Sequence, residues 1–401
     1  MTASQQEGTG NADSENVGPL RWLEDEFAAL METKGLRRLS VRESPHVAGQ
    51  VQIEGKPYLD FGSNDYLELS ARGELLDAVR SCSGHVGWGS GASPLIHGRG
   101  TLHRRLEQEL AAFEGTESAL TFSSGYAANL GVIASVVGKG DFIFSDARNH
   151  ASIIDGCRLS GAEILVYRHN DIDHLTHLLD EVSSQAGRRL IVTDALFSMD
   201  GDLANLRDLA PLAEKEGAML MVDEAHGTGV FGVQGRGVSE HLGVKERVDI
   251  LVGTLSKSIG CHGGFVAGTR RLTDWIANRA RSYVFSTAVP EATCMAAVAA
   301  LGLVKELGEQ RKQLLEKADW LRQELRTRGW NLGNSSSQII PVILGDNESV
   351  LKKQAELMEA GIYVPAIRPP SVPNGESLLR ISLTTGHTDA ILGRLIEKLG
   401  K

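Results

Sequence analysis

The stretch Val248-Asp-Ile-Leu-Val-Gly-Thr-Leu-Ser-Lys257-Ser-Ile-Gly decides the predicted fold, because a mostly apolar strand in it leads to a lysine. A second stretch, Ala218-Met-Leu-Met-Val-Asp223-Glu-Ala-His226, is built the same way and leads to an acid and a histidine. Lysine is almost never buried unless it is paired or used in chemistry, and burial favours its reactive neutral amine. An acid and a lysine at neighbouring strand ends suit pyridoxal phosphate (PLP): the acid would pair with the pyridine nitrogen and the lysine would hold the aldehyde.

Helices and short apolar strands alternate around these two stretches. The predicted strands cover residues 118–122, 141–145, 163–167, 189–193, 219–222, 248–252 and 264–267. This alternation is typical of an α/β protein with a mostly parallel sheet, and the continuous apolar strands predict helices on both faces. A helix over 20–34 and short strands at 50–54 and 56–61 come before this region. A long helical stretch over 291–328, in two pieces, and a smaller α+β part come after it.

The change of pattern near Pro290 predicts a domain boundary. We expect a disordered tail (1–18), an N-terminal arm (19–60), a large cofactor-binding domain (61–290) and a small C-terminal domain (291–401). The tail is polar and acidic and lacks the basic and apolar regions of a signal peptide.

The composition argues against several classes of partner. A net charge of −10 disfavours a nucleic-acid surface and an anionic membrane surface, and no window of eighteen residues is wholly apolar. The four cysteines lie far apart without a CxxC pair, which predicts neither a metal site nor a disulfide framework and fits a reducing cytoplasm.

Four loops at the predicted strand ends carry polar groups, and ligands of parallel sheets bind at these ends. The loop at Ser124 offers a helix N-terminus to a phosphate, although a simple N-cap is an alternative. His150 could stack on a ring or be structural, and Ser198 could bond a ring oxygen or stabilise a turn. The residues Asp223-Glu-Ala-His226 also match a helicase motif, but the sequence lacks the phosphate-binding loop that a helicase needs. Together with Lys257, the four loops favour a PLP site.

The chain resembles the α-oxoamine synthases, a branch of the fold-type-I PLP enzymes, from about Leu36 to its C-terminus. The motifs that carry the resemblance are spread along the chain in a specific order. They are Gly62-Ser-Asn64-Asp-Tyr66-Leu, Gly89-Ser-Gly91-Ala-Ser, Ser123-Ser-Gly-Tyr-Ala-Ala-Asn129, Asn149-His150-Ala-Ser, Phe197-Ser198-Met-Asp-Gly-Asp202, Val222-Asp223-Glu-Ala-His226-Gly-Thr-Gly, Thr254-Leu-Ser-Lys257 and Phe285-Ser286-Thr287.

The resemblance implies a role for each matching residue. Lys257 corresponds to the Schiff-base lysine, Asp223 to the partner of the pyridinium nitrogen, and His150 to the stacking ring. The other implied cofactor contacts are His226 and Ser198 at the ring hydroxyl, and Ser124, Gly125, Tyr126 and Thr254 at the phosphate.

Further roles concern the neighbouring subunit and the substrates. Ser286 and Thr287 resemble residues that reach the phosphate of a neighbour, which implies a homodimer. The implied substrate residues are Asn64 and Arg380 at the amino-acid carboxylate, Arg37 or Arg38 near the acyl group, and Arg368 in Arg-Pro-Pro at the acyl channel.

Within the family, the Arg368-Pro-Pro stretch and Leu379-Arg-Ile-Ser-Leu are most similar to the biotin-pathway enzymes. The resemblance implies a decarboxylative condensation of L-alanine with a pimeloyl thioester, carried by coenzyme A or by a carrier protein. Another enzyme of the branch, such as a glycine C-acetyltransferase, and a non-catalytic partner subunit are the alternatives. Three departures from the family pattern, expected near the substrate entrance, are Glu68, Pro94 and His97-Gly-Arg99.

Overall fold

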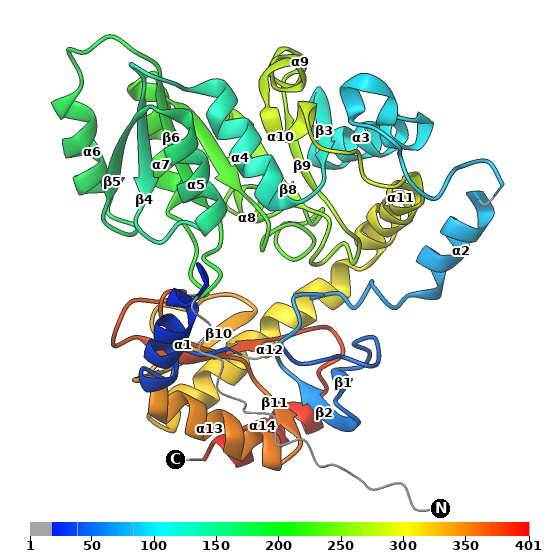
Figure 1. The fold of residues 1–401 in the computed structure, drawn as a ribbon, viewed down its shortest axis with the longest axis vertical. Coiled ribbons are helices and arrows are strands. Elements are labelled where there is room, and N and C mark those ends of the chain that lie inside the picture. Colours follow the sequence, from blue (N-terminus) through cyan, green and yellow to red (C-terminus); the bar gives the residue numbers. More distant parts are fainter. Residues whose placement is uncertain (1–17, 38, 83, 401) are drawn as a thin grey trace, which may run out of the picture.

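The computed structural model describes residues 18–37, 39–82 and 84–400, and it arranges them in two connected bodies (Figure 1). The upper body holds a seven-stranded sheet and the lower body two small sheets. The predicted tail and Arg38 lie outside the described residues, apart from Gly18.

The seven-stranded sheet confirms the α/β prediction. Its order is β3-β9-β8-β7-β6-β4-β5, and β5, β4, β6, β7 and β8 pair in parallel. The one strand that runs the other way is β9, which pairs antiparallel with both β3 and β8. The bounds are β3 Ser118–Phe122, β4 Phe142–Asp146, β5 Glu163–Tyr167, β6 Arg189–Asp194, β7 Met219–Asp223, β8 Ile250–Thr254 and β9 Gly264–Gly268.

Helices cover both faces of this sheet because its central strands bury apolar side chains on each side. Along β6, Leu190 and Val192 pack with α4 and α5, whereas Ile191 belongs to the core formed with α6 and α7. At the β3 edge, α3 and α11 pack against Phe265. The helix bounds are α2 Gly73–Cys82, α3 Thr101–Glu114, α4 Gly125–Val136, α5 Ala151–Ser160, α6 Ile172–Glu181, α7 Leu206–Lys215, α8 Val238–His241, α9 Arg270–Arg279, α10 Arg281–Val284 and α11 Glu291–Glu306.

The lower body joins the N-terminal residues to the C-terminal part of the chain. Strand β2 pairs antiparallel with β1 and parallel with β11, and β13 pairs with β10 and β12. The bounds are α1 Trp22–Glu32, β1 Gln50–Ile53, β2 Lys56–Asp60, α12 Gly308–Thr327, β10 Ile339–Gly345, α13 Asn347–Glu359, β11 Ile362–Tyr363, β12 Ala366–Ile367, β13 Ser377–Ser382 and α14 Asp389–Leu399.

The long helical stretch after Pro290 is present as α11 and α12, as predicted. Helix α11 contacts α2 and α3 of the upper body, and α12 descends from it into the lower body (Figure 1). The division of the chain at residue 290 remains a prediction. The sequence patterns did not predict α2, α8, α9, α10 or α14.

Candidate active site

Several strand ends of the large sheet meet at one cavity. The carboxyl ends of parallel strands lie at the same edge, so the residues that follow β3, β4, β7 and β8 come together there. The lining residues are Ser124, Gly125, Tyr126, Asn129, His150, Ser152, Asp194, Asp223, Ala225, His226, Thr254, Ser256 and Lys257. The predicted gathering of cofactor residues is therefore present, while the role of each residue remains a prediction.

The N-terminus of α4 offers hydrogen-bond donors to this cavity. Ser124 caps the helix, and its Oγ accepts from the N–H of Ala127 at 3.0 Å. The N–H groups of Gly125 and Tyr126 have no acceptor within the described part of the chain, which is the arrangement that binds a phosphate at a helix N-terminus. Gly264 on β9 permits this loop to close, because a Cβ there would lie 2.5 Å from the Gly125 nitrogen.

Asp223 is a buried carboxylate with a fixed orientation. Its Oδ2 accepts from Asn129 Nδ2 at 2.6 Å, and its Oδ1 accepts from the N–H of Ala225 at 2.8 Å. Asn129 Nδ2 also donates to Ser152 Oγ at 2.9 Å. These bonds hold the carboxylate at the cavity wall, where it can pair with a cationic ring nitrogen.

A second buried acid lies beside the first. Asp194 is the register partner of Asp223 across β6 and β7, and its Oδ2 accepts from the N–H of His150 at 2.7 Å. Burial raises the pKa of Asp194 well above its usual value, and the neighbouring charge of Asp223 adds to the rise. Asp194 therefore holds a proton more readily than an ordinary carboxyl does.

Burial also shifts the basic groups of the cavity. It lowers the pKa of Lys257 to about 8, although Asp223 and Asp194 act in the opposite direction. It lowers the pKa of His150, and it lowers the pKa of His226 well below the usual value, with the charge of Lys257 contributing to both. At neutral pH both imidazoles are therefore uncharged, and the amine reaches its neutral form easily.

Arg380 links the small β13 sheet to the cavity. Its Nε donates to the Ser198 carbonyl oxygen at 2.5 Å, and one terminal nitrogen donates to Asn64 Oδ1 at 3.0 Å. The Tyr66 hydroxyl lies 3.3 Å from the same Asn64 oxygen and 2.6 Å from His226 Nδ1. The other terminal nitrogen of Arg380 is buried and has no partner within residues 18–37, 39–82 and 84–400. An anion is the natural ligand for such a group.

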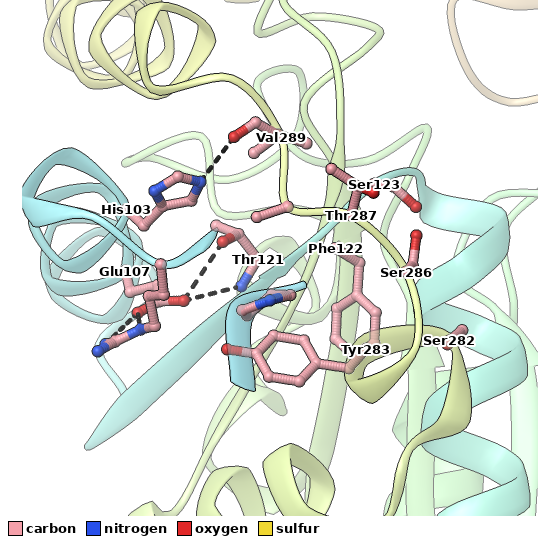
Figure 2. A pocket seen from close by; sticks show the side chains of 13 residues that line it. His103, Glu107, Thr121, Phe122, Ser123, Ser282, Tyr283, Ser286, Thr287 and Val289 are labelled. Carbon is pink, nitrogen blue, oxygen red and sulfur yellow. Dashed lines mark hydrogen bonds and ion pairs between the residues drawn. The ribbon is translucent and has the colours of Figure 1, made fainter. Parts of the chain in front are cut away.

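Ser286 and Thr287 do not line this cavity. They border a second cavity, with Ser123 at the start of the phosphate loop and with Tyr283 (Figure 2). Thr287 is exposed and Ser286 is half-buried. Their position suits contact with another copy of the chain rather than with the cofactor cavity of their own.

The two predicted acyl-site arginines make backbone contacts outside the cofactor cavity. Arg37 donates to the carbonyl oxygens of Arg368 at 3.2 Å and Pro369 at 3.3 Å. The guanidinium of Arg368 donates to the Lys34 carbonyl oxygen. The two side chains thus tie the N-terminal segment to the turn that follows β12, and contact with an acyl substrate remains a prediction.

Asn129, Asp194 and Tyr66 are among the site residues that received no role in the sequence analysis. Asn129 and Tyr66 stand inside recognised motifs, but only the fold shows that they orient Asp223 and His226. Asp194 ends an apolar strand just as Asp223 does, so that pattern could have identified it.

The residues that depart from the family pattern lie in two different places in the structure. Glu68 has a φ of +54° and accepts from the N–H groups of Ala48 at 2.7 Å and Gly49 at 2.9 Å. It therefore connects the residues after Asp60 to the predicted N-terminal arm. Glu68 does not line the cofactor cavity. Pro94 and Arg99 instead border the second cavity, beside Ser286 and Thr287.

The cavity fits PLP in three respects that are visible in its own residues. The free N–H groups at α4 suit the phosphate, the oriented Asp223 suits the pyridine nitrogen, and Lys257 suits the aldehyde. Asn129 Oδ1 is a further buried polar atom without a protein partner in the described chain.

Within the described residues, no cluster of three or more His, Cys, Asp or Glu side chains is placed to hold a metal ion. In the same residues, no helix has the length and apolar character needed to cross a membrane.

Comparison with known sequences identifies the family. Residues 56–399 match the family model of aminotransferase class I and II. An 8-amino-7-oxononanoate synthase of Geotalea daltonii is 45% identical over 88% of this chain and 90% of its own length. Another of that name, from Anaeromyxobacter dehalogenans, is 46% identical over 93% of both chains.

Solved structures agree with this assignment. Serine palmitoyltransferase of Sphingomonas wittichii superposes with a TM-score of 0.88 at 35% identity and covers 96% of this chain and 97% of its own. 8-Amino-7-oxononanoate synthase of Francisella tularensis gives a TM-score of 0.74 at 28% identity and covers 85% of this chain and 96% of its own. A further neighbour, SPT solved with PLP, is 33% identical with a TM-score of 0.87. The chain has the type-I PLP-enzyme fold and belongs to the aminotransferase class I and II family of PLP-dependent enzymes.

Proposed function

We propose that this chain condenses L-alanine with a pimeloyl thioester, forming 8-amino-7-oxononanoate and releasing carbon dioxide and the free thiol, in biotin biosynthesis. The acyl donor is pimeloyl-CoA or its carrier-protein form. The relatives named 8-amino-7-oxononanoate synthase, which cover most of the chain, support an acyltransferase of this type. The observation that carries the proposal is the unpaired, buried guanidinium nitrogen of Arg380 beside a cavity that holds Lys257 and Asp223.

The residues of the cavity divide the chemistry between them. When bound, PLP supplies an aldehyde that takes up the amino group and a pyridine ring that withdraws electrons from the substrate Cα. Lys257, with a pKa of about 8, accepts the Cα proton as a neutral amine and returns a proton after carbon dioxide has left. The Asp223 carboxylate keeps the ring nitrogen protonated.

The neutral histidines fit roles that need an uncharged ring. His150 would stack on the cofactor, and His226, held by Tyr66, would contact the ring hydroxyl together with Ser198. Arg380 binds the alanine carboxylate through its unpaired terminal nitrogen, while Ser198 and Asn64 fix the orientation of the guanidinium. Arg37 and Arg368 remain our assignments at the acyl channel.

The substrate pair is tested by measuring release of coenzyme A over a grid of amino acids and acyl thioesters. We expect the highest kcat/KM with L-alanine and pimeloyl-CoA. The grid includes glycine with acetyl-CoA, and L-serine with palmitoyl-CoA because solved serine palmitoyltransferases are structurally similar. A preference for either of those pairs would refute the proposed substrates and leave the family unchanged. No turnover with any pair, in a protein that binds PLP, would favour the non-catalytic partner subunit.

Replacement of Arg380 by lysine should weaken L-alanine binding more than it slows turnover. A lysine ammonium cannot also make the bonds to Ser198 and Asn64 that orient the guanidinium, so KM for L-alanine should rise about tenfold or more. Arg368→Ala is the matched comparison and should mainly raise KM for the pimeloyl thioester. Steady-state kinetics with each substrate varied in turn separates the two effects. Equal KM changes for both substrates in both variants would contradict the assignment.

We also propose a homodimer whose subunits share their cofactor sites. Thr287 and Ser286 lie outside the cavity of their own chain and beside the exposed Phe285, so they are free to meet a second copy. The proposed contact is with the phosphate bound by the neighbour.

We assign the protein to the cytoplasm. All four cysteines are unpaired, and the cytoplasm is a reducing compartment in which cysteines stay unpaired.

A further inference from the structure

The exposed segment 285–287 is held between two anchors. On its N-terminal side, Ser282 Oγ donates to the Ala127 carbonyl oxygen at 2.5 Å, and the Tyr283 ring packs edge-on against Phe122 at 5.4 Å. Phe285, in the segment itself, is 72% exposed. The residues just before the segment are therefore fixed to α4 and β3.

The second anchor lies two residues after the segment, at Val289. Its carbonyl oxygen accepts from Ser90 Oγ at 2.7 Å, and the His103 Nε2 lies 2.7 Å from it (Figure 2). The tautomer of His103 follows from its other nitrogen, since Nδ1 accepts from the N–H of Gly100 at 3.1 Å. Nε2 therefore carries the hydrogen and donates to Val289. His103 is only 2% exposed, so this bond is shielded from water.

One turn further along α3, Glu107 holds the strand that leads into the chain's own phosphate loop. Its Oε1 accepts from the N–H and the hydroxyl of Thr121, both at 3.3 Å, and Figure 2 shows both bonds. Its Oε2 accepts from Arg99 Nε at 2.9 Å. Thr121 stands three residues before Ser124, which caps α4. His103 and Glu107 are four residues apart and share one helix face.

We propose that this face of α3 is a positioning element for two active sites: Glu107 sets the phosphate loop of its own subunit, and His103 sets the segment 285–287 that serves the neighbour. The inference rests on the proposed sharing of phosphate sites. Neither residue lines the cofactor cavity, so both act through the backbone segments that they hold. Arg99, a departure from the family pattern, completes the Glu107 side of this element.

A dimer with a single intact site tests the inference. One subunit carries Lys257→Ala, and the other carries Ser286→Ala with Thr287→Val; the two are co-expressed with different tags and purified through both. The only complete site then combines Lys257 of the second subunit with Ser286 and Thr287 of the first. Cofactor binding at that site is read from the visible absorbance that depends on Lys257, during titration of the apo-dimer with PLP.

His103→Leu is then placed in either subunit of this dimer. In the subunit that donates Ser286 and Thr287, it should raise the apparent Kd for PLP about five- to tenfold, the effect of losing one buried hydrogen bond. In the subunit that carries Lys257, it should leave the Kd within about twofold. The two dimers contain identical sets of substitutions, so a general loss of stability would affect both equally.

Glu107→Leu should show the opposite dependence on its position: it should weaken PLP binding when it is placed in the subunit that carries Lys257.

Ser90→Ala removes the other donor to Val289 and should act like His103→Leu if the latter does not fold. His103→Gln, whose amide can still donate to Val289, should restore binding, and Ser183→Ala, which removes only a surface bond to Asp180, is the control.

The outcomes separate the inference from its premise. If the dimer without α3 substitutions lacks a functional site, or if Ser286→Ala with Thr287→Val has no effect in the homodimer, the shared site itself is refuted. If that dimer works but His103→Leu has the same effect in either subunit, the positioning role of α3 is refuted while the shared site stands.

Discussion

Lys257→Ala should leave a folded protein that binds PLP and shows no turnover. The variant loses the amine that holds the cofactor aldehyde and moves the Cα proton, and no other lysine lines the cavity. A pKa of about 8 gives about a tenth of the amine in its neutral form at pH 7, whereas an ordinary lysine has less than about a thousandth. Losing a nucleophile and proton-transfer group of this kind costs at least about 10⁴-fold in rate.

Two measurements check this expectation. Borohydride reduction of the wild-type holoenzyme followed by peptide mapping should label Lys257, and the coenzyme A release assay should show no activity in the variant. The thermal midpoint of the apoprotein is the control. It should not fall, because the lowered pKa shows that the fold disfavours the lysine charge. A different labelled lysine would falsify the assignment.

The strand ends could be predicted because their chemistry is local. An apolar run followed by Asp223, or by Thr254 and Lys257, fixes both the strand and the edge at which its polar residues emerge. The parallel order of the sheet then places such residues together without any knowledge of side-chain contacts. This is why most cofactor residues of the prediction line one cavity.

What the sequence could not supply is the relation between segments that only the fold brings together. Strand β9 runs antiparallel to the other strands of the sheet but has the same apolar pattern as they have. The direction of a strand cannot be deduced from its composition. The pairing of Asp194 with Asp223 depends on the register of β6 and β7. The bond from His103 to Val289 joins residues 186 positions apart. No local pattern encodes any of these relations.

Asp223→Ala should reduce cofactor affinity and lower the rate by at least about 10²-fold, the scale of losing one charge-stabilising group in a dry site. The charge-assisted bond to the ring nitrogen is itself worth about 1.5–3 kcal/mol. Removing the carboxylate also leaves the N–H of Ala225 without its acceptor and leaves Asn129 Nδ2 with Ser152 Oγ alone. Part of the loss in this variant is therefore structural.

Asp223→Asn separates the charge from the structure, because an amide oxygen can still accept one of these bonds. In that variant Asp194 no longer faces a negative neighbour, so its raised pKa should fall toward the usual value. Burial still raises the pKa of Asp194 in that variant, but a larger fraction of this carboxyl is charged than in the wild type, and this charge rescues part of the rate. We expect Asp223→Asn to be more active than Asp223→Ala, and Asp194→Asn to abolish that difference when it is combined with Asp223→Asn. Rates at saturating PLP, with PLP Kd values for the three variants and the wild type, test this order. Near-wild-type activity in Asp223→Ala would exclude the role of Asp223 as the partner of the ring nitrogen.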